Sequence, residues 1–141
     1  MKKTISIVIL IVSLMLFFSY QAKSQADEIT KLCTQYLVPP FISDGQQYKA
    51  LLNGDELAEF HSSFYGGSTY RIIACSGLSE GNLLFSLYDK ERNLLFTNKN
   101  YENSPYWDFK FSSTIECILE AELDTKNSSS GFAILMIGFK Q

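Results

Sequence analysis

From residue 48 to residue 140, hydrophobic side chains recur at every second position, which is the period of a β-strand with two different faces. The alternation is clearest where Trp107, Phe109 and Phe111 are separated by the charged residues Asp108 and Lys110. The next segment continues the pattern, with the inward set Ile115, Cys117, Leu119 and Ala121 and the outward set Glu116, Glu120 and Glu122. This part of the chain is therefore predicted to be all-β.

Eight short segments with this pattern are separated by turn signals such as Asn53-Gly54 and Gly66-Gly67. The predicted strands are Tyr48–Leu52, Glu56–Tyr65, Thr69–Ser76, Leu83–Asp89, Leu94–Thr97, Trp107–Phe111, Ile115–Glu122 and Phe132–Lys140. The third and the last are apolar on both faces, which predicts central positions in a sheet. The arrangement indicates an antiparallel β-sandwich.

The first residues have the composition of a secretory signal peptide. Met1-Lys2-Lys3 precedes an apolar run from Ile5 to Tyr20, and small residues around Ser24 and Ala26 suit a signal peptidase. We predict a signal peptide over residues 1–24. The alternative is an uncleaved membrane anchor, for which the apolar run is short of the ~20 residues that a span needs.

A short helix is predicted from Ser24 to Leu37, because Ile29, Leu32, Cys33 and Tyr36 recur at helical spacing. Pro39 and Pro40 end it. Residues 25–40 would then be a helix and linker, and residues 41–141 a single β-sandwich domain of ordinary size.

Charge limits the classes of partner. Without Lys2, Lys3 and Lys23, nine basic residues face fifteen acidic ones, a net charge of −6, and no basic cluster occurs. Nucleic acids and anionic membrane surfaces are therefore excluded as expected partners.

Three cysteines in an exported protein predict one disulfide and one leftover thiol. Cys117 occupies an inward-facing position of its strand, in the same alternation (parity) as Ile115 and Leu119. Cys75 lies on a strand whose outer face is apolar and must be covered by another segment. The helix that carries Cys33 is the available cover, so we predict a Cys33–Cys75 disulfide and a buried Cys117. The alternative is three reduced, buried cysteines. With one histidine and no Cys-x-x-Cys, no metal site and no cofactor are expected.

The sequence offers few candidates for a catalytic or calcium-binding site. His61 has Glu59 and Ser63 on the same strand face and Ser62 beside it, but no Gly-x-Ser-x-Gly is present, so a surface histidine is expected rather than a small hydrolase. The glutamates at 116, 120 and 122 are typical of a solvated sheet face. Calcium ligation by Asp44-Gly45 or by residues 89–93 is less expected than plain turn chemistry.

Aromatic residues near the end of the long polar connection are better candidates for a contact surface. Trp107 shares parity with core residues, whereas Tyr101 and Tyr106 do not. Exposed tyrosines stack on sugars and anchor protein partners. We therefore predict that Tyr101 and Tyr106 contact a ligand or partner.

Several of these segments carry a resemblance to a known family. Gly66-Gly67-Ser68-Thr69-Tyr70-Arg71-Ile72, Leu87-Tyr88-Asp89, Trp107–Phe111 and Ile115–Leu119 resemble the small β-sandwich of the bacterial prepeptidase C-terminal type and small exported proteins of Bacteroidota-type bacteria. The resemblance spans Tyr48 to the end. It implies a jelly-roll-like accessory domain without a catalytic site, here with no enzyme attached.

Taken together, these patterns predict an exported, non-catalytic interaction or accessory module, located in the periplasm, outside the cell or on its surface. Its partner would be a protein or a glycan, and the main alternative is a carbohydrate-binding module that uses exposed aromatic residues.

Overall fold

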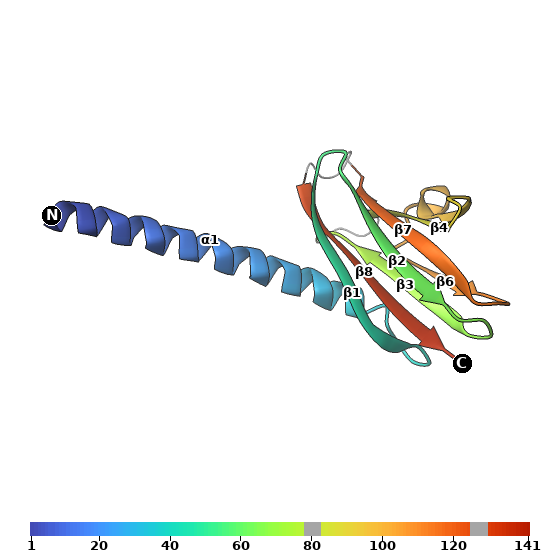
Figure 1. Cartoon of the computed structure of the whole chain (residues 1–141). Coiled ribbons are helices and arrows are strands. Elements are labelled where there is room, and N and C mark those ends of the chain that lie inside the picture. The colour runs from blue at the N-terminus through green and yellow to red at the C-terminus, as the bar shows by residue number, and fades with distance from the viewer. Residues whose placement is uncertain (78–82, 125–129) are drawn as a thin grey trace.

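Two four-stranded antiparallel sheets pack face to face in the computed structural model, which describes residues 1–77, 83–124 and 130–141 (Figure 1). One sheet has the order β1-β8-β3-β6 and the other β2-β7-β4-β5. The strands are β1 (Ile42–Asn53), β2 (Leu57–Phe64), β3 (Thr69–Cys75), β4 (Leu83–Asp89), β5 (Leu94–Thr97), β6 (Tyr106–Lys110), β7 (Ile115–Leu123) and β8 (Ser130–Lys140). The predicted antiparallel β-sandwich of eight strands is confirmed.

The hydrophobic core lies between the sheets and is built from the inward parity of each strand. Phe64, Ile72, Phe85, Leu119 and Leu135 are among its fully buried members. Burying such side chains contributes about 1.5–3 kcal/mol each, which is the main force that holds the two sheets together.

The two strands that are apolar on both faces occupy interior positions, as predicted. β8 pairs with β1 on one side and with β3 on the other, and β3 also pairs with β6. Their second apolar face turns away from the sandwich core, and this face is covered by the helix described below.

The first strand is longer than predicted. It begins at Ile42 instead of Tyr48, and its pairing with β8 is interrupted by a bulge between Ser43 and Gln47. Gly45 has a φ of +83° within this bulge, a conformation that favours glycine. The Asp44-Gly45 pair therefore kinks a strand and does not form a separate loop.

The helix α1 (Lys2–Thr34) runs without interruption across Ser24, where the sequence predicted a new helix to begin, and it ends three residues before the predicted Leu37. Its first half extends away from the sandwich, and the side chains of residues 4–13 are exposed (Figure 1). Among the described residues, no helix combines the length and hydropathy of a membrane span. The boundaries at residues 24 and 40 stay predictions.

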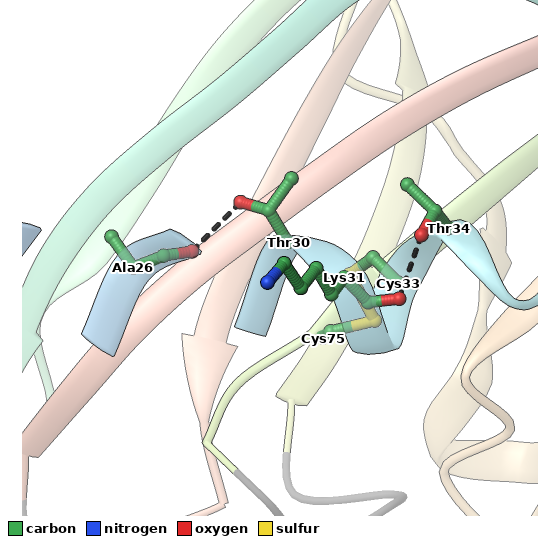
Figure 2. The surroundings of a disulfide bond; sticks show 6 residues. All are labelled: Ala26, Thr30, Lys31, Cys33, Thr34 and Cys75. Atoms are coloured by element: carbon green, nitrogen blue, oxygen red, sulfur yellow. Dashed lines mark hydrogen bonds between the residues drawn. A yellow bond between two sulfur atoms is a disulfide. The ribbon is translucent and has the colours of Figure 1, made fainter. Parts of the chain in front are cut away.

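The last turns of α1 cover the outer face of the β1-β8-β3-β6 sheet. Ile29 and Cys33 are buried there against Ile73, Ile134 and Met136, in a second hydrophobic cluster. The predicted Cys33–Cys75 disulfide joins the helix to the end of β3, with the two Cα atoms 5.9 Å apart (Figure 2). Helix and sheet are therefore linked covalently as well as by burial.

Arg71 fixes the segment that follows the helix. Its guanidinium makes a paired hydrogen bond to Asp108 (Nε–Oδ1 2.7 Å, second nitrogen to Oδ2 2.9 Å) and donates to the carbonyl oxygen of Tyr36 at 3.0 Å. It also lies between two aromatic rings, with its Cζ atom 4.2 Å from the centroid of Phe41 and 4.4 Å from that of Tyr106. One side chain thus connects β3, β6 and the end of the helix.

Candidate functional site

An open hollow of about 910 Å³ lies at the end of the sandwich where β2 and β8 finish and β3 and β7 begin. In Figure 1 this is the end that carries the label C. The lining residues are Asp44, Gln46, His61, Ser62, Ser63, Tyr65, Ser68, Tyr70, Lys90, Glu116, Cys117, Ile118, Phe139 and Gln141. Its volume is in the range of ligand sites, and the lining mixes apolar surface with hydroxyl, phenol and carboxylate groups.

Tyr65 stands on the loop between β2 and β3, with 65% of its surface exposed. Its backbone N–H donates to the hydroxyl of Tyr70 at 3.0 Å. The N–H of Gly67 donates to the carbonyl oxygen of Phe111 at 3.0 Å, and this glycine has a φ of +90°. These bonds fix the loop, so the exposed ring is carried on an ordered backbone.

Gly66 explains why the loop sits so close to its neighbour. A Cβ atom added at Gly66 would lie 2.8 Å from the Cα atom of Ser113, which is backbone and cannot move aside. The two glycines that the sequence marked as a turn therefore have separate reasons: Gly66 allows close approach, and Gly67 supplies the positive φ.

Two carboxylates belong to the lining. Asp44 is half-buried and accepts a hydrogen bond from the backbone N–H of Gln46 at 2.8 Å. Its partial burial raises the pKa of the Asp44 carboxyl above the ordinary value, and the N–H of Gln46 partly offsets this. Glu116 is exposed on the outer face of β7.

A network of charges covers the outer face of the second sheet beside the hollow. Arg92, held at a φ of 64° in the turn after β4, reaches Glu59 on β2 and Glu120 on β7. Arg92 and His61 both hydrogen-bond to Glu59, and they lower the pKa of its carboxyl. Lys99 pairs with Glu122. The glutamates at 120 and 122 are thus held in ion pairs on a sheet surface.

His61 is a surface residue, with 70% of its side chain exposed, as the sequence indicated. Its Nε2 atom lies 2.9 Å from Glu59 Oε1. Ser62 pairs with Cys117 and so faces inward, whereas Ser63 shares the outward face of His61. The hydroxyl of Tyr48 donates to the backbone carbonyl oxygen of His61 at 3.4 Å, but within the described parts of the chain no hydroxyl group hydrogen-bonds to the His61 ring, which therefore activates no serine there.

The structure does not bring the two predicted contact tyrosines together. Tyr101 lies in the 3₁₀ helix η1 (Asn98–Tyr101), 47% exposed, with its ring 4.3 Å from that of Trp107 and stacked on Phe96. Tyr106 packs on Tyr36 in the cluster beneath α1 and lies against Arg71. Trp107 belongs to the core side of β6, so these tyrosines lie on opposite faces of that strand. Each stays a separate candidate.

The cysteines are placed as predicted. Cys33 and Cys75 form the disulfide, and Cys117 is a buried free thiol. Burial raises the pKa of Cys117 to about 11, with a smaller contribution from Asp89. This thiol stays protonated at neutral pH and is chemically quiet.

Among the residues that the structure describes, no three His, Cys, Asp or Glu side chains lie close enough together to hold a metal ion. The Asp89 carboxylate accepts from the backbone N–H and the side-chain amide of Asn93, each at 2.8 Å. The Asp89 carboxylate is therefore used in hydrogen bonds that stabilise the turn.

Tyr65 was missed by reasoning from the sequence, although it continues the outward-facing positions Glu59, His61 and Ser63 of its predicted strand. Its place directly before Gly66-Gly67 was a second signal. A bulky aromatic residue at the end of a strand, next to a tight reversal, has no neighbouring strand to cover it.

Comparison with known proteins gives a fold but no family. No protein-family model matches the chain, and no curated protein matches it in sequence. The resemblance to the prepeptidase C-terminal type therefore stays a prediction.

A solved structure is similar in fold: Aeromonas hydrophila PliG, a periplasmic lysozyme inhibitor of g-type lysozyme. The match has a TM-score of 0.52 at 12% sequence identity and covers 70% of this chain and 91% of that chain. This chain therefore shares its β-sandwich fold with a periplasmic inhibitor protein.

Proposed function

We propose that the protein is exported and binds a partner protein at the hollow, with Tyr65 as the main contact and without catalysing a reaction. The carrying observation is the largely exposed Tyr65 ring on a loop fixed by hydrogen bonds at the rim of an open hollow. Tyrosine is enriched among the residues that dominate binding energy, and an ordered loop loses little conformational entropy on binding.

The hydrolase class is the first class of partner to test. The solved structure with a similar fold is a lysozyme inhibitor, and the match covers 91% of that chain. This similarity suggests lysozymes as the first partners to test. A non-catalytic role is supported by His61, whose described partner is Glu59 and not a hydroxyl nucleophile. Export is supported by the composition of residues 1–24 and by the disulfide.

The test uses the full chain, expressed for export and purified, with immobilised g-type lysozyme and two other lysozyme classes as probes. Tyr65→Ala is compared with Tyr101→Ala, a change at a tyrosine that is 47% exposed and does not line the hollow. We expect one lysozyme to bind and to lose lytic activity, with affinity about 30-fold weaker for Tyr65→Ala and within about twofold for Tyr101→Ala.

Three results would count against the proposal. Binding to none of the lysozymes would remove the hydrolase partner. Loss of binding in Tyr101→Ala alone would move the site to η1. Capture of oligosaccharides on a glycan array that disappears in Tyr65→Ala would favour the carbohydrate-binding alternative.

A further inference from the structure

We infer that the hollow receives a cationic side chain, a lysine or an arginine, that projects from the partner. This inference rests on the proposed function, because it assigns the chemistry of the same site. Its basis is the contrast between carboxylates that form ion pairs within the chain and carboxylates of the hollow that do not.

The outer face of β2 and β7 carries four glutamates. Arg92 pairs with Glu59 and Glu120, and Lys99 pairs with Glu122. The fourth, Glu116, lines the hollow and forms no ion pair within residues 1–77, 83–124 and 130–141. The fold thus pairs three of these glutamates with two cations and leaves the glutamate at the hollow without one.

Asp44 is the second such carboxylate, and it approaches the hollow from the opposite sheet. The bulge in β1 places it there, and its hydrogen bond comes from a backbone N–H and not from a cation. Burial of a carboxylate without a counter-charge is unfavourable, as the raised pKa of Asp44 reflects. A bound cation would remove that cost.

The other charged groups of the lining do not neutralise these two. Lys90 is 67% exposed in its side chain and lies 3.9 Å from Glu91. His61 is engaged with Glu59. The hollow therefore keeps an excess of negative charge at neutral pH, in a chain whose residues from 25 onward carry a net charge of −6.

The shape and the aromatic rim suit the same ligand. A volume of about 910 Å³ accommodates a long side chain together with its flanking backbone. Tyr65 lines the hollow and is largely exposed, and a guanidinium or ammonium group over an exposed aromatic ring gains about 0.5–1 kcal/mol. Negative charge on the protein also speeds encounter with a basic partner.

The experiment uses short peptides as probes, so that it does not depend on finding the partner. The ¹⁵N-labelled full chain is titrated at low salt with acetyl-Gly-Arg-Gly-amide, its lysine equivalent, and the peptide in which neutral citrulline replaces arginine. We expect the two cationic peptides to shift the amide resonances around Asp44, Tyr65 and Glu116, and the citrulline peptide to leave them unchanged.

Matched variants test the carboxylates. We expect the double variant Asp44→Asn/Glu116→Gln to bind the arginine peptide about tenfold more weakly, and Glu28→Gln, an exposed carboxylate on α1, to bind it as the wild type does. Equal shifts with citrulline, equal binding by the double variant, or shifts confined to other surfaces would each overturn the inference.

Failure of this inference and failure of the proposed function are distinguishable. If a lysozyme binds through Tyr65 but the charge-neutral double variant binds it equally well, the protein-binding role stands and the cationic contact is wrong. If the arginine peptide binds at the hollow and no lysozyme does, the cation site stands and the hydrolase partner is wrong.

Discussion

Asn98 is the most informative single residue for stability. It is fully buried, and its side chain satisfies three backbone groups. Its Oδ1 accepts from the N–H of Phe85 at 2.9 Å, and its Nδ2 donates to the carbonyl oxygens of Leu83 at 3.0 Å and Ser104 at 3.1 Å. The amide therefore ties β4 to the connection that leads into β6.

We expect Asn98→Ala to lower the free energy of unfolding by about 2–4 kcal/mol, because it leaves three backbone groups without their partner. Urea denaturation followed by tryptophan fluorescence measures this. Asn100→Ala, an exposed change two residues away, is the matched control and should stay within about 0.5 kcal/mol. Similar losses in both variants would show that the hydrogen bonds of Asn98 are not the cause.

Single residues were also where reasoning from the sequence was least complete. Parity placed Cys117 and Trp107 on the core side of their strands, and both lie there. Parity could not separate Tyr101, Tyr106 and Tyr65, because burial of a loop or strand-end residue depends on what another segment brings over it. The helix covers Tyr106, and nothing in the described structure covers Tyr65.

At the scale of elements, α1 and the segment that follows it are attached to the sandwich by three kinds of interaction. The disulfide is covalent, the cluster around Ile29 is apolar, and Arg71 supplies both charge and stacking. The hydrogen bonds that Arg71 donates to Asp108 raise the pKa of the guanidinium, and only 13% of the arginine side chain is exposed. The guanidinium of Arg71 is therefore shielded from solvent far better than that of Arg92, whose side chain is 56% exposed.

We expect Arg71→Lys to lower the free energy of unfolding by about 1–2 kcal/mol, because lysine keeps the charge but loses the two-pronged bond to Asp108 and the planar stacking. Arg92→Lys, in the exposed network with Glu59 and Glu120, should cost less than about 0.5 kcal/mol. Thermal unfolding by circular dichroism compares the two. A larger loss for the Arg92 variant would contradict this ranking.

Elements were predicted well because their signals are local. The Leu83–Asp89 and Leu94–Thr97 strands have the same bounds in the structure. The start of β1 was missed, since Ser43, Asp44 and Gly45 carry no apolar alternation. Their strand conformation comes from pairing with β8, a partner almost a hundred positions away in sequence.

At the scale of the whole molecule, the disulfide closes a long loop. Cys33 and Cys75 are 42 positions apart, and in the chain-entropy model such a closure contributes about 3–4 kcal/mol by restricting the unfolded chain. It also fixes the helix on the one sheet face that would otherwise expose Ile73 and Ile134.

We expect Cys33→Ala/Cys75→Ala to lower the free energy of unfolding by about 3–4 kcal/mol in urea titrations. The bond itself is checked by thiol counting under denaturing conditions. One thiol, Cys117, should react before reduction and three after it, while in the folded protein at pH 8 the buried Cys117 should resist alkylation. Three reactive thiols without reduction would show that the bond is absent.

The position of β8 has a consequence for how the chain matures. β8 lies between β1 and β3 and is the last of the three strands to be synthesised. The sheet therefore lacks the strand that joins β1 to β3 until residue 140 has left the ribosome. Pairing across such a sequence distance is slow to nucleate. We therefore expect this sheet to close only after β8 has emerged, so that β1 and β3 stay unpaired with each other's neighbour until that point in synthesis.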